Sequence, residues 1–281
     1  MPRESPALTE VVCVCSRRDV GTWKVAARNV VRHIPAARYR LYVPDDEVPF
    51  FEAATPAPFQ VLPESILIDA IRPVLIEAMA AGRRDRVGWY LQQFIKLAAV
   101  RGAAAGEVVL IWDADTIPLR PLQFVSGSGR IRYYKGGEHH LPYFDLIRRL
   151  VGLERQVDFS FVAQCFAIRA EWMHELCAKL ETEPGLSWFE AIIRQIDFTE
   201  ESGFSEYETL GTFIAADHGR EIEFSDRPWS RYGSRLTGGI EYLDEGEATR
   251  LARRYDFVSF EHWERRPRWP ALHRIVMRLR G

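Results

Sequence analysis

Apolar and polar positions along the first half of the chain follow a pattern that predicts strands and helices in turn. Apolar runs bounded by polar residues or proline are typical of strands buried in a parallel sheet. Such runs predict four strands, at residues 11–14, at 38–43, within 58–67 and at 108–112. Apolar residues at helical spacing predict helices over residues 23–32 and 87–100. This alternation predicts an α/β domain around a mostly parallel sheet.

The second half of the chain has a more mixed pattern. Strands are predicted within residues 129–137 and 159–170, and helices over residues 171–181, 187–197 and 205–217. The sequence contains no internal repeat, no low-complexity segment and no linker-like stretch. We therefore expect one domain over residues 1–281.

Composition narrows the class of protein without identifying it. The 281 residues are 47% hydrophobic and 27% charged, with a formal net charge of −2, which gives no general attraction to nucleic acid. The N-terminal stretch lacks the layout of a signal peptide, and no apolar run approaches the roughly 18 residues of a membrane span. The 4 cysteines lack C-x-x-C spacing and are expected to be buried free thiols. These features predict a soluble, cytoplasmic protein.

Two acids directly follow the most apolar of the predicted strands. The stretch VVLIWDADTIPL carries five apolar residues and then Asp113 and Asp115. In open α/β sheets, ligands bind beyond the carboxyl ends of the strands. Two carboxylates this close repel each other unless a positive charge lies nearby, and a divalent cation such as Mg²⁺ or Mn²⁺ prefers oxygen ligands. The context therefore favours a metal site, although a D-x-D pair alone is a weak signal.

Two other interpretations of the acid pair remain open. Asp113 and Asp115 could cap a turn, with help from Thr116 and Pro118. The stretch also resembles the nucleophile strand of haloacid dehalogenase-type phosphatases and phosphotransferases. That pattern has Thr or Val two positions after the second Asp, where this chain has Ile117, and it lies near the N-terminus, whereas three predicted strands precede it here.

The segments around the acid pair resemble those of a known enzyme family. WYLQQFIKL, then VVLIWDADTIPLRPL, and later FSEYETLGTF are similar to GT-A type glycosyltransferases, and more narrowly to a bacterial group of GT-A-like proteins with mostly unassigned substrates. The resemblance runs from the first strand to His262. It implies a GT-A fold, a Rossmann-like mixed sheet flanked by helices with the DxD motif at a strand end. It divides the domain into a nucleotide-binding half (10–125), an acceptor half (126–262) and a basic C-terminal tail (263–281).

The resemblance also assigns roles on the donor side of the site. Asp113 and Asp115 would hold Mn²⁺ or Mg²⁺ on the diphosphate of a nucleotide sugar, with Asp115 the more direct ligand and Asp113 in contact with ribose or metal. The loop after the first strand, with Cys15, Ser16 and Arg17, would receive base and ribose. The fixed positive fork of arginine suits phosphate or ribose oxygens, although an ordinary solvated loop has the same composition.

Two more candidates have structural alternatives. Lys96 lies in the helix before the metal strand, where related enzymes carry a charged residue facing the donor; it could equally be the solvent edge of an amphipathic helix. His262, in FVSFEHW, matches a late histidine that serves as a metal or phosphate ligand in GT-A enzymes. The same histidine could simply satisfy a neighbouring hydrogen bond.

The acceptor side has one candidate base. An inverting transfer requires a carboxylate within reach of the acceptor hydroxyl. Glu206 and Glu208 lie at the start of a predicted helix, and related families place their acid there, so we expect Glu206 to be catalytic together with Asp115. Both glutamates could instead complement the helix N-terminus. A retaining enzyme would not need this base in the same way.

Two other segments could contact the acceptor. YYKGGEHHLPYF contains groups that bind sugars, including Lys135, His139 and His140, and is expected to be an acceptor loop, with a mobile surface loop as the alternative. The tail from Trp263 carries six arginines against one glutamate, interleaved with apolar residues. That pattern suits peripheral contact with an anionic membrane, or a terminal helix docked on the domain.

The function expected from the sequence is metal-dependent transfer of a sugar from a nucleotide-diphosphate donor to an acceptor hydroxyl. The resemblance places it in bacterial polysaccharide or glycoconjugate synthesis, with a glycan or a lipid-linked acceptor as partner. A metal-dependent phosphotransferase or nucleotidyltransferase, or a GT-A scaffold that binds nucleotide or glycan without turnover, are the alternatives. Fold analogy cannot supply the sugar or the stereochemical outcome.

Overall fold

The computed structural model describes residues 8–80 and 82–264 and has a five-stranded central sheet. The strand order is β3-β2-β1-β4-β7. The first four strands are parallel, and β7 joins β4 antiparallel, with Trp112 opposite Cys165. The bounds are β1 (Glu10–Val14), β2 (Arg38–Val43), β3 (Phe59–Pro63), β4 (Val108–Trp112) and β7 (Cys165–Arg169). The predicted α/β class with a mostly parallel, mixed sheet is confirmed.

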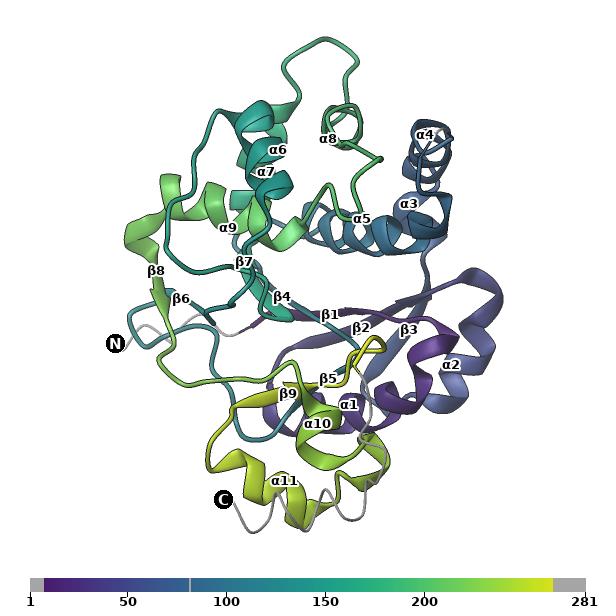
Figure 1. Ribbon diagram of the computed structural model, residues 1–281, viewed down its shortest axis with the longest axis vertical. Helices are drawn as coiled ribbons and strands as arrows, with labels where there is room; N and C mark the ends of the chain where they lie inside the picture. The colour runs from purple at the N-terminus through teal and green to yellow at the C-terminus, as the bar shows by residue number, and fades with distance from the viewer. Residues whose placement is uncertain (1–7, 81, 265–281) are drawn as a thin grey trace.

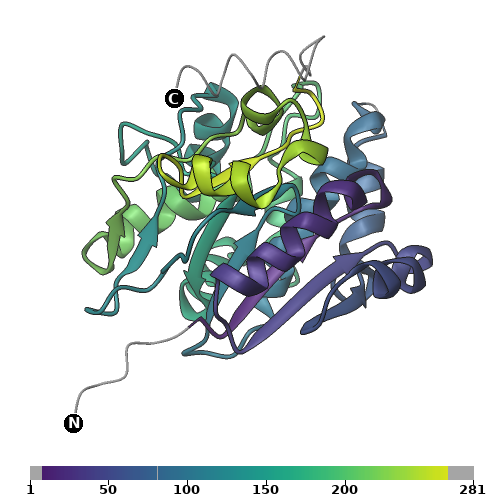
Figure 2. The same cartoon turned by 90° about the horizontal axis from the view of Figure 1, so that it is seen from below.

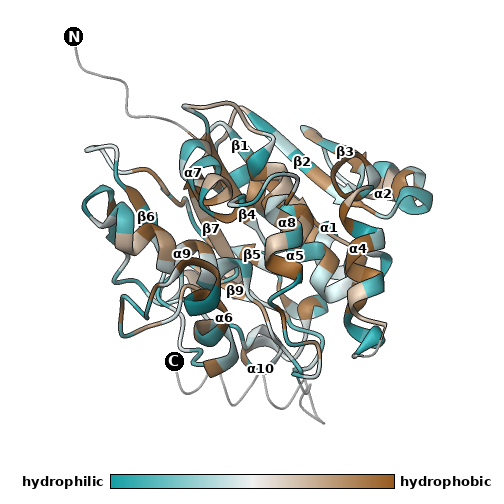
Figure 3. Ribbon diagram, turned by 90° about the horizontal axis from the view of Figure 1, so that it is seen from above, coloured by the Kyte–Doolittle hydropathy of each residue, from teal (hydrophilic) through white to brown (hydrophobic). Residues whose placement is uncertain are grey.

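Helices cover both sides of this sheet (Figure 1). The apolar stripe of α5 lies on one side and α1 on the other, so β4 is buried along its whole length. The helices are α1 (Val20–His33), α2 (Val48–Ala54), α3 (Ser65–Ile68), α4 (Ile71–Ala78), α5 (Val87–Arg101), α6 (Leu141–Val151), α7 (Ala170–Leu180), α8 (Trp188–Ile193), α9 (Glu206–Asp217), α10 (Gly233–Thr237) and α11 (Glu245–Ala252). Hydrophobic residues gather on the central strands and the helix faces towards them (Figure 3).

Two short strand pairs connect distant parts of the chain. β5 (Thr116–Pro118) pairs antiparallel with β9 (Phe257–Ser259), and β6 (Ile131–Tyr133) pairs parallel with β8 (Ile222–Phe224). The β5–β9 pair lies on the same side of the central sheet as α1 and α10 (Figures 1 and 2). Because β5 begins one residue after Asp115, this pairing brings the end of the described chain to the acid pair.

Some elements occupy only part of the range predicted for them. The strand predicted within 58–67 spans Phe59–Pro63, and Ser65–Ile68 form α3. The strand predicted within 159–170 begins only at Cys165, because Gln164 has a φ of 62° and the chain turns there. The expected acceptor loop ends early, since Leu141 begins α6.

The structure bears on membrane contact only for the residues that it describes. Among residues 8–80 and 82–264, no helix combines the length and the hydrophobicity that crossing a bilayer requires. The basic tail (263–281), with its expected peripheral membrane contact, lies outside the described residues except for Trp263 and Glu264.

Candidate functional site

The order of the sheet places a switch point between β1 and β4. β1 lies between β2 and β4, so the chain leaves β1 towards one edge of the sheet and returns at β4 on the other side. At such a switch point the loops after the two neighbouring strands separate, and ligands bind there in open α/β sheets. One of these loops carries Cys15, Ser16 and Arg17, and the other carries Asp113 and Asp115. The topology therefore brings the predicted donor residues to one end of the sheet.

The backbone of the acid pair is held from two sides. The Asp113 N–H donates to the carbonyl of Gln164, at 3.0 Å, in the turn before β7. The Asp115 carbonyl accepts the Phe260 N–H at 2.9 Å, just after β9. These bonds fix the two carboxylates between segments that are separated from them by about 50 and 145 residues along the chain.

Lys96 is at the centre of a buried charge network. Its Nζ lies 2.6 Å from Asp113 Oδ1 and 2.7 Å from Glu206 Oε1. The Tyr207 hydroxyl donates to the same Asp113 oxygen at 2.6 Å, and the Lys96 ammonium lies 4.6 Å from the centre of the Tyr207 ring. The alternative interpretation of Lys96 as a solvent edge is wrong, because the side chain is buried and faces the acids.

The pKa values in this network follow from burial and charge. Burial alone would lower the pKa of Lys96, but Asp113 and Glu206 outweigh it, so its pKa is raised and the side chain stays protonated. Burial raises the pKa of Glu206, and Lys96 opposes that effect. Burial, followed by the charges of Asp113 and Glu206, raises the pKa of Tyr207, which stays neutral and can donate its hydrogen bond.

The two glutamates at the start of α9 point to different partners. Glu206 faces Lys96, and its backbone N–H donates to Gln93 Oε1 at 3.0 Å. Glu208 accepts the Ser160 hydroxyl at 2.6 Å and the Phe161 N–H at 3.2 Å, away from Lys96. Of the two glutamates, Glu206 is therefore the one that lies with Lys96 and Asp113.

Asp115 is surrounded by other carboxylates. Burial, then the negative charges of Glu261, Asp113 and Asp19, raise its pKa well above the usual value, and only a hydrogen bond from Thr116 opposes them. Burial and Asp113 also raise the pKa of Glu261, against the lowering effect of Arg231. Carboxylate oxygens that repel one another are a donor set that suits Mg²⁺ or Mn²⁺.

The protein side chains alone do not complete a metal site. Among the residues that the structure describes, no three His, Cys, Asp or Glu side chains converge closely enough to hold an ion. Asp113 is already engaged by Lys96 and Tyr207. A cation beside Asp115 would therefore take further ligands from substrate oxygens, as Mg²⁺ commonly does.

His262 lies next to the loop after β1. Its Nε2 contacts Asp19 Oδ1, and 43% of its side chain is exposed. Asp19 in turn contributes to the field at Asp115. The structure thus brings His262 next to the acid cluster, which consists of Asp19, Asp113, Asp115 and Glu261. The role of His262 as a metal or phosphate ligand stays a prediction.

The first loop contributes one buried and one exposed candidate. Cys15 is buried, and burial raises the pKa of its thiol, so the thiol stays neutral; the expected contact of this residue with base and ribose stays a prediction. Ser16 precedes a short 3₁₀ helix, Arg17–Asp19. Arg17 is exposed, lies over the Phe50 ring at 4.7 Å and forms a 3.9 Å ion pair with Glu47.

Sequence reasoning missed three residues of the site. Asp19 ends the loop after β1, Tyr207 lies between the two candidate glutamates, and Glu261 directly precedes His262. Each is a sequence neighbour of a residue that was predicted. The signal that could have identified them is the presence of a charged or hydroxyl group at positions that the fold brings to the same sheet end.

Known structures share this architecture at low sequence identity. Mouse xyloside xylosyltransferase 1 matches with a TM-score of 0.52 and 13% identity over 92% of this chain and 99% of that chain. An active-site mutant of LgtC matches with a TM-score of 0.50 and 12% identity over 97% of this chain and 96% of that chain. The fold is therefore that of the GT-A glycosyltransferases, as the sequence predicted.

Sequence comparison gives a family without an assigned activity. No curated protein matches the sequence. The sequence model of one family, described as a family of unknown function (DUF6492), matches residues 29–224. Because this match covers more than half of the chain, the protein belongs to the DUF6492 family.

Proposed function

We propose that the protein is a metal-dependent glycosyltransferase that moves a sugar from a nucleotide-diphosphate donor to an acceptor hydroxyl. The observation that carries the proposal is the carboxylate cluster around Asp115 at the switch point of a GT-A fold. One neighbour of the same fold is named as a xylosyltransferase. That name describes the neighbour, and sugar transfer by this chain is the proposal.

The cation is Mn²⁺ or Mg²⁺ in this proposal, and Asp115 would be its main protein ligand. When bound, it would stabilise the negative charge on the leaving diphosphate. Asp113, held by Lys96 and Tyr207, would then orient the ribose or support the cation from one side. His262 and Arg17 lie on the loops that flank the switch point, where they would contact donor phosphates or the nucleoside.

Glu206 has two properties relevant to acid–base chemistry. Burial raises its pKa, which is the direction that a general base requires near neutral pH. Its carboxylate is also paired with Lys96, and its side chain is almost fully buried. The sequence prediction of a base at Glu206 thus stays a prediction. The contacts favour a positioning role, in which Glu206 holds Lys96 against Asp113.

The wider setting is part of the proposal and is supported by the family resemblance. We place the reaction in the cytoplasm, in bacterial polysaccharide or glycoconjugate synthesis, with a glycan or lipid-linked acceptor. One domain with a nucleotide-binding half at 10–125 and an acceptor half at 126–262 is the organisation that this proposal uses.

The experiment is a thermal-shift and hydrolysis screen of nucleotides and nucleotide sugars with and without Mn²⁺. A donor that binds the folded state raises the melting temperature in proportion to ln(1 + [L]/Kd). We expect a shift that requires Mn²⁺, slow donor hydrolysis, and loss of both in Asp115→Asn. Asp85→Asn, an exposed acid that pairs with Arg83, is the matched control and should retain both.

Three outcomes would contradict the proposal. A complete absence of Mn²⁺-dependent shifts across nucleotides would remove the donor site. A phosphatase activity with a phosphorylated Asp113 would instead identify the phosphotransferase alternative. Tight nucleotide binding with no turnover of any donor would instead identify the protein as a scaffold that binds nucleotide without catalysis.

A further inference from the structure

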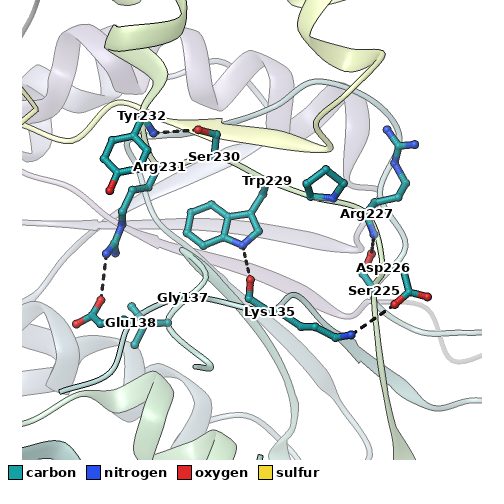
Figure 4. Close-up of a pocket in the computed structure, with 12 residues that line it drawn as sticks. Lys135, Gly137, Glu138, Ser225, Asp226, Arg227, Trp229, Ser230, Arg231 and Tyr232 are labelled. Carbon is teal, nitrogen blue, oxygen red and sulfur yellow. Dashed lines mark hydrogen bonds and ion pairs between the residues drawn. The ribbon is translucent and has the colours of Figure 1, made fainter. Parts of the chain in front are cut away.

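A cavity of about 490 Å³ lies between two segments of the second half of the chain (Figure 4). One wall comes from residues 135–138, which belong to the segment that the sequence suggested as an acceptor loop. The opposite wall comes from residues 225–232, between β8 and α10. This volume lies within the usual range of small-molecule binding sites, about 300–1,000 Å³.

Trp229 forms a fixed aromatic platform in this cavity (Figure 4). Its indole Nε1 donates to the Lys135 carbonyl at 2.9 Å, which bridges the two walls. One face stacks on Phe257, with 5.4 Å between the ring centres and 19° between the planes. The side chain remains half-buried, so its other face is the one on which a ligand can stack. An indole held at one face and one edge loses little entropy when a ligand binds.

The cations that line the cavity are each paired with a carboxylate. Lys135 lies 3.4 Å from Asp226 across the cavity, and Arg231 lies 3.0 Å from Glu138. Arg227 contacts the buried Asp256. A phosphate or carboxylate ligand would have to displace one of these acids and would meet their repulsion. The lining therefore favours an uncharged ligand that both donates and accepts hydrogen bonds.

Arg231 connects this cavity to the acid cluster. Its Nε lies 3.3 Å from Glu261 Oε1, on the side away from Glu138. Glu261 follows Phe260, whose N–H donates to the Asp115 carbonyl. A ligand in the cavity would thus lie one side chain away from the carboxylate that raises the pKa of Asp115.

We propose that this cavity binds an uncharged sugar ring of the acceptor, stacked on Trp229 and hydrogen-bonded by Glu138 and Arg231. A sugar ring has an apolar C–H face that suits an indole and a rim of hydroxyls that suits mixed carboxylate and guanidinium partners. The nucleotide has its own place at the switch point. Calling this sugar the acceptor rests on the proposed function. The inference that the cavity binds a sugar does not rest on it.

The test measures binding of methyl glycosides of neutral hexoses and pentoses by saturation-transfer NMR, in the absence of donor and metal. We expect at least one glycoside to bind, and Trp229→Ala to weaken it about tenfold, equivalent to about 1.4 kcal/mol. Trp89→Ala is the matched control, because Trp89 is also half-buried but lies on α5 beneath Arg86, and its loss should leave binding unchanged. Glu138→Gln keeps the stacked indole and should weaken binding even if Trp229→Ala does not fold.

Different results would overturn different claims. Equal binding by wild type, Trp229→Ala and Glu138→Gln would overturn the inference, as would tighter binding of methyl glucuronide or inorganic phosphate than of any neutral glycoside. If no neutral glycoside binds while nucleotides bind with Mn²⁺, the inference fails and the proposed function stands. If glycosides bind through Trp229 while no donor binds or turns over, the sugar site stands and the proposed transfer fails.

Discussion

Replacing Lys96 by methionine tests the charge network directly. Methionine keeps most of the length and apolar volume of the side chain and removes only the ammonium. In the wild-type protein this ammonium holds Asp113 and Glu206 together, and all three side chains are largely shielded from water, with 6%, 19% and 6% exposure for Lys96, Asp113 and Glu206. The substitution therefore leaves two buried carboxylates facing each other.

The expected cost follows from the distances. Because Lys96 Nζ is 2.6 Å from Asp113 Oδ1 and 2.7 Å from Glu206 Oε1, those two oxygens are at most about 5.3 Å apart. At an effective dielectric constant of about 20, two unit negative charges at that distance repel by about 3 kcal/mol. Removing one partner from a buried ion pair costs about 3–5 kcal/mol. We expect Lys96→Met to lower the free energy of unfolding by about 3–5 kcal/mol.

The assay is urea unfolding of Lys96→Met, Glu206→Gln and the double variant. Removing the charge of Glu206 as well should recover a large part of the loss, which appears as a coupling energy in the double-mutant cycle. Lys24→Met, at an exposed position of α1, should change the stability by less than about 0.5 kcal/mol. A loss below about 1 kcal/mol for Lys96→Met, or strict additivity in the cycle, would refute the network.

Two further predictions concern α9. Burial raises the pKa of Glu208 above its usual 4.5, so the folded protein retains a proton that the unfolded chain releases. The contribution of this carboxyl group to stability is complete below about pH 4.5. It is lost as the pH rises through the pKa of Glu208 in the folded protein. The glutamine of Glu208→Gln cannot titrate, so the melting temperature of this variant should fall less than that of the wild type between about pH 5 and pH 8. An equal fall in both proteins would contradict a raised pKa of Glu208. Gly211→Ala should lower the free energy of unfolding by about 1–3 kcal/mol, because its Cβ would lie 2.0 Å from the Phe161 ring. Gly88→Ala, with nothing within 4 Å, should instead be neutral or stabilising by up to about 1 kcal/mol, and similar unfolding curves for the two variants would show that Phe161 can move aside.

The central sheet and the position of the acids could be predicted because both depend on local patterns. β4 is continuously apolar and is buried on both faces, and α5 precedes it with regular spacing. The acids follow β4 directly, so the strand prediction placed them at the sheet end. The short β5 and β9 have no such pattern, since three residues carry too little periodicity to be recognised.

Contacts between distant residues could not be predicted in the same way. Lys96 resembled a solvent edge because its helix also carries polar Gln92 and Gln93, and its burial depends on α9, which begins 110 residues later. The role of Glu261 depends on the β5–β9 pairing. The cavity around Trp229 is likewise formed by two loops that no local pattern joins.

The bond between the Asp115 carbonyl and the Phe260 N–H has a consequence for how the protein is made. A ribosome that has just added residue 115 still has to add 145 more residues before this bond can form. Until then, β5 lacks its partner β9, and the backbone of the acid pair can be held from one side only, by the bond between the Asp113 N–H and the Gln164 carbonyl. Such late, non-local closure slows folding, because the entropy of a long loop is lost before the contact stabilises the chain. A nascent chain that ends before Phe257 would therefore have a central sheet but an unformed acid cluster.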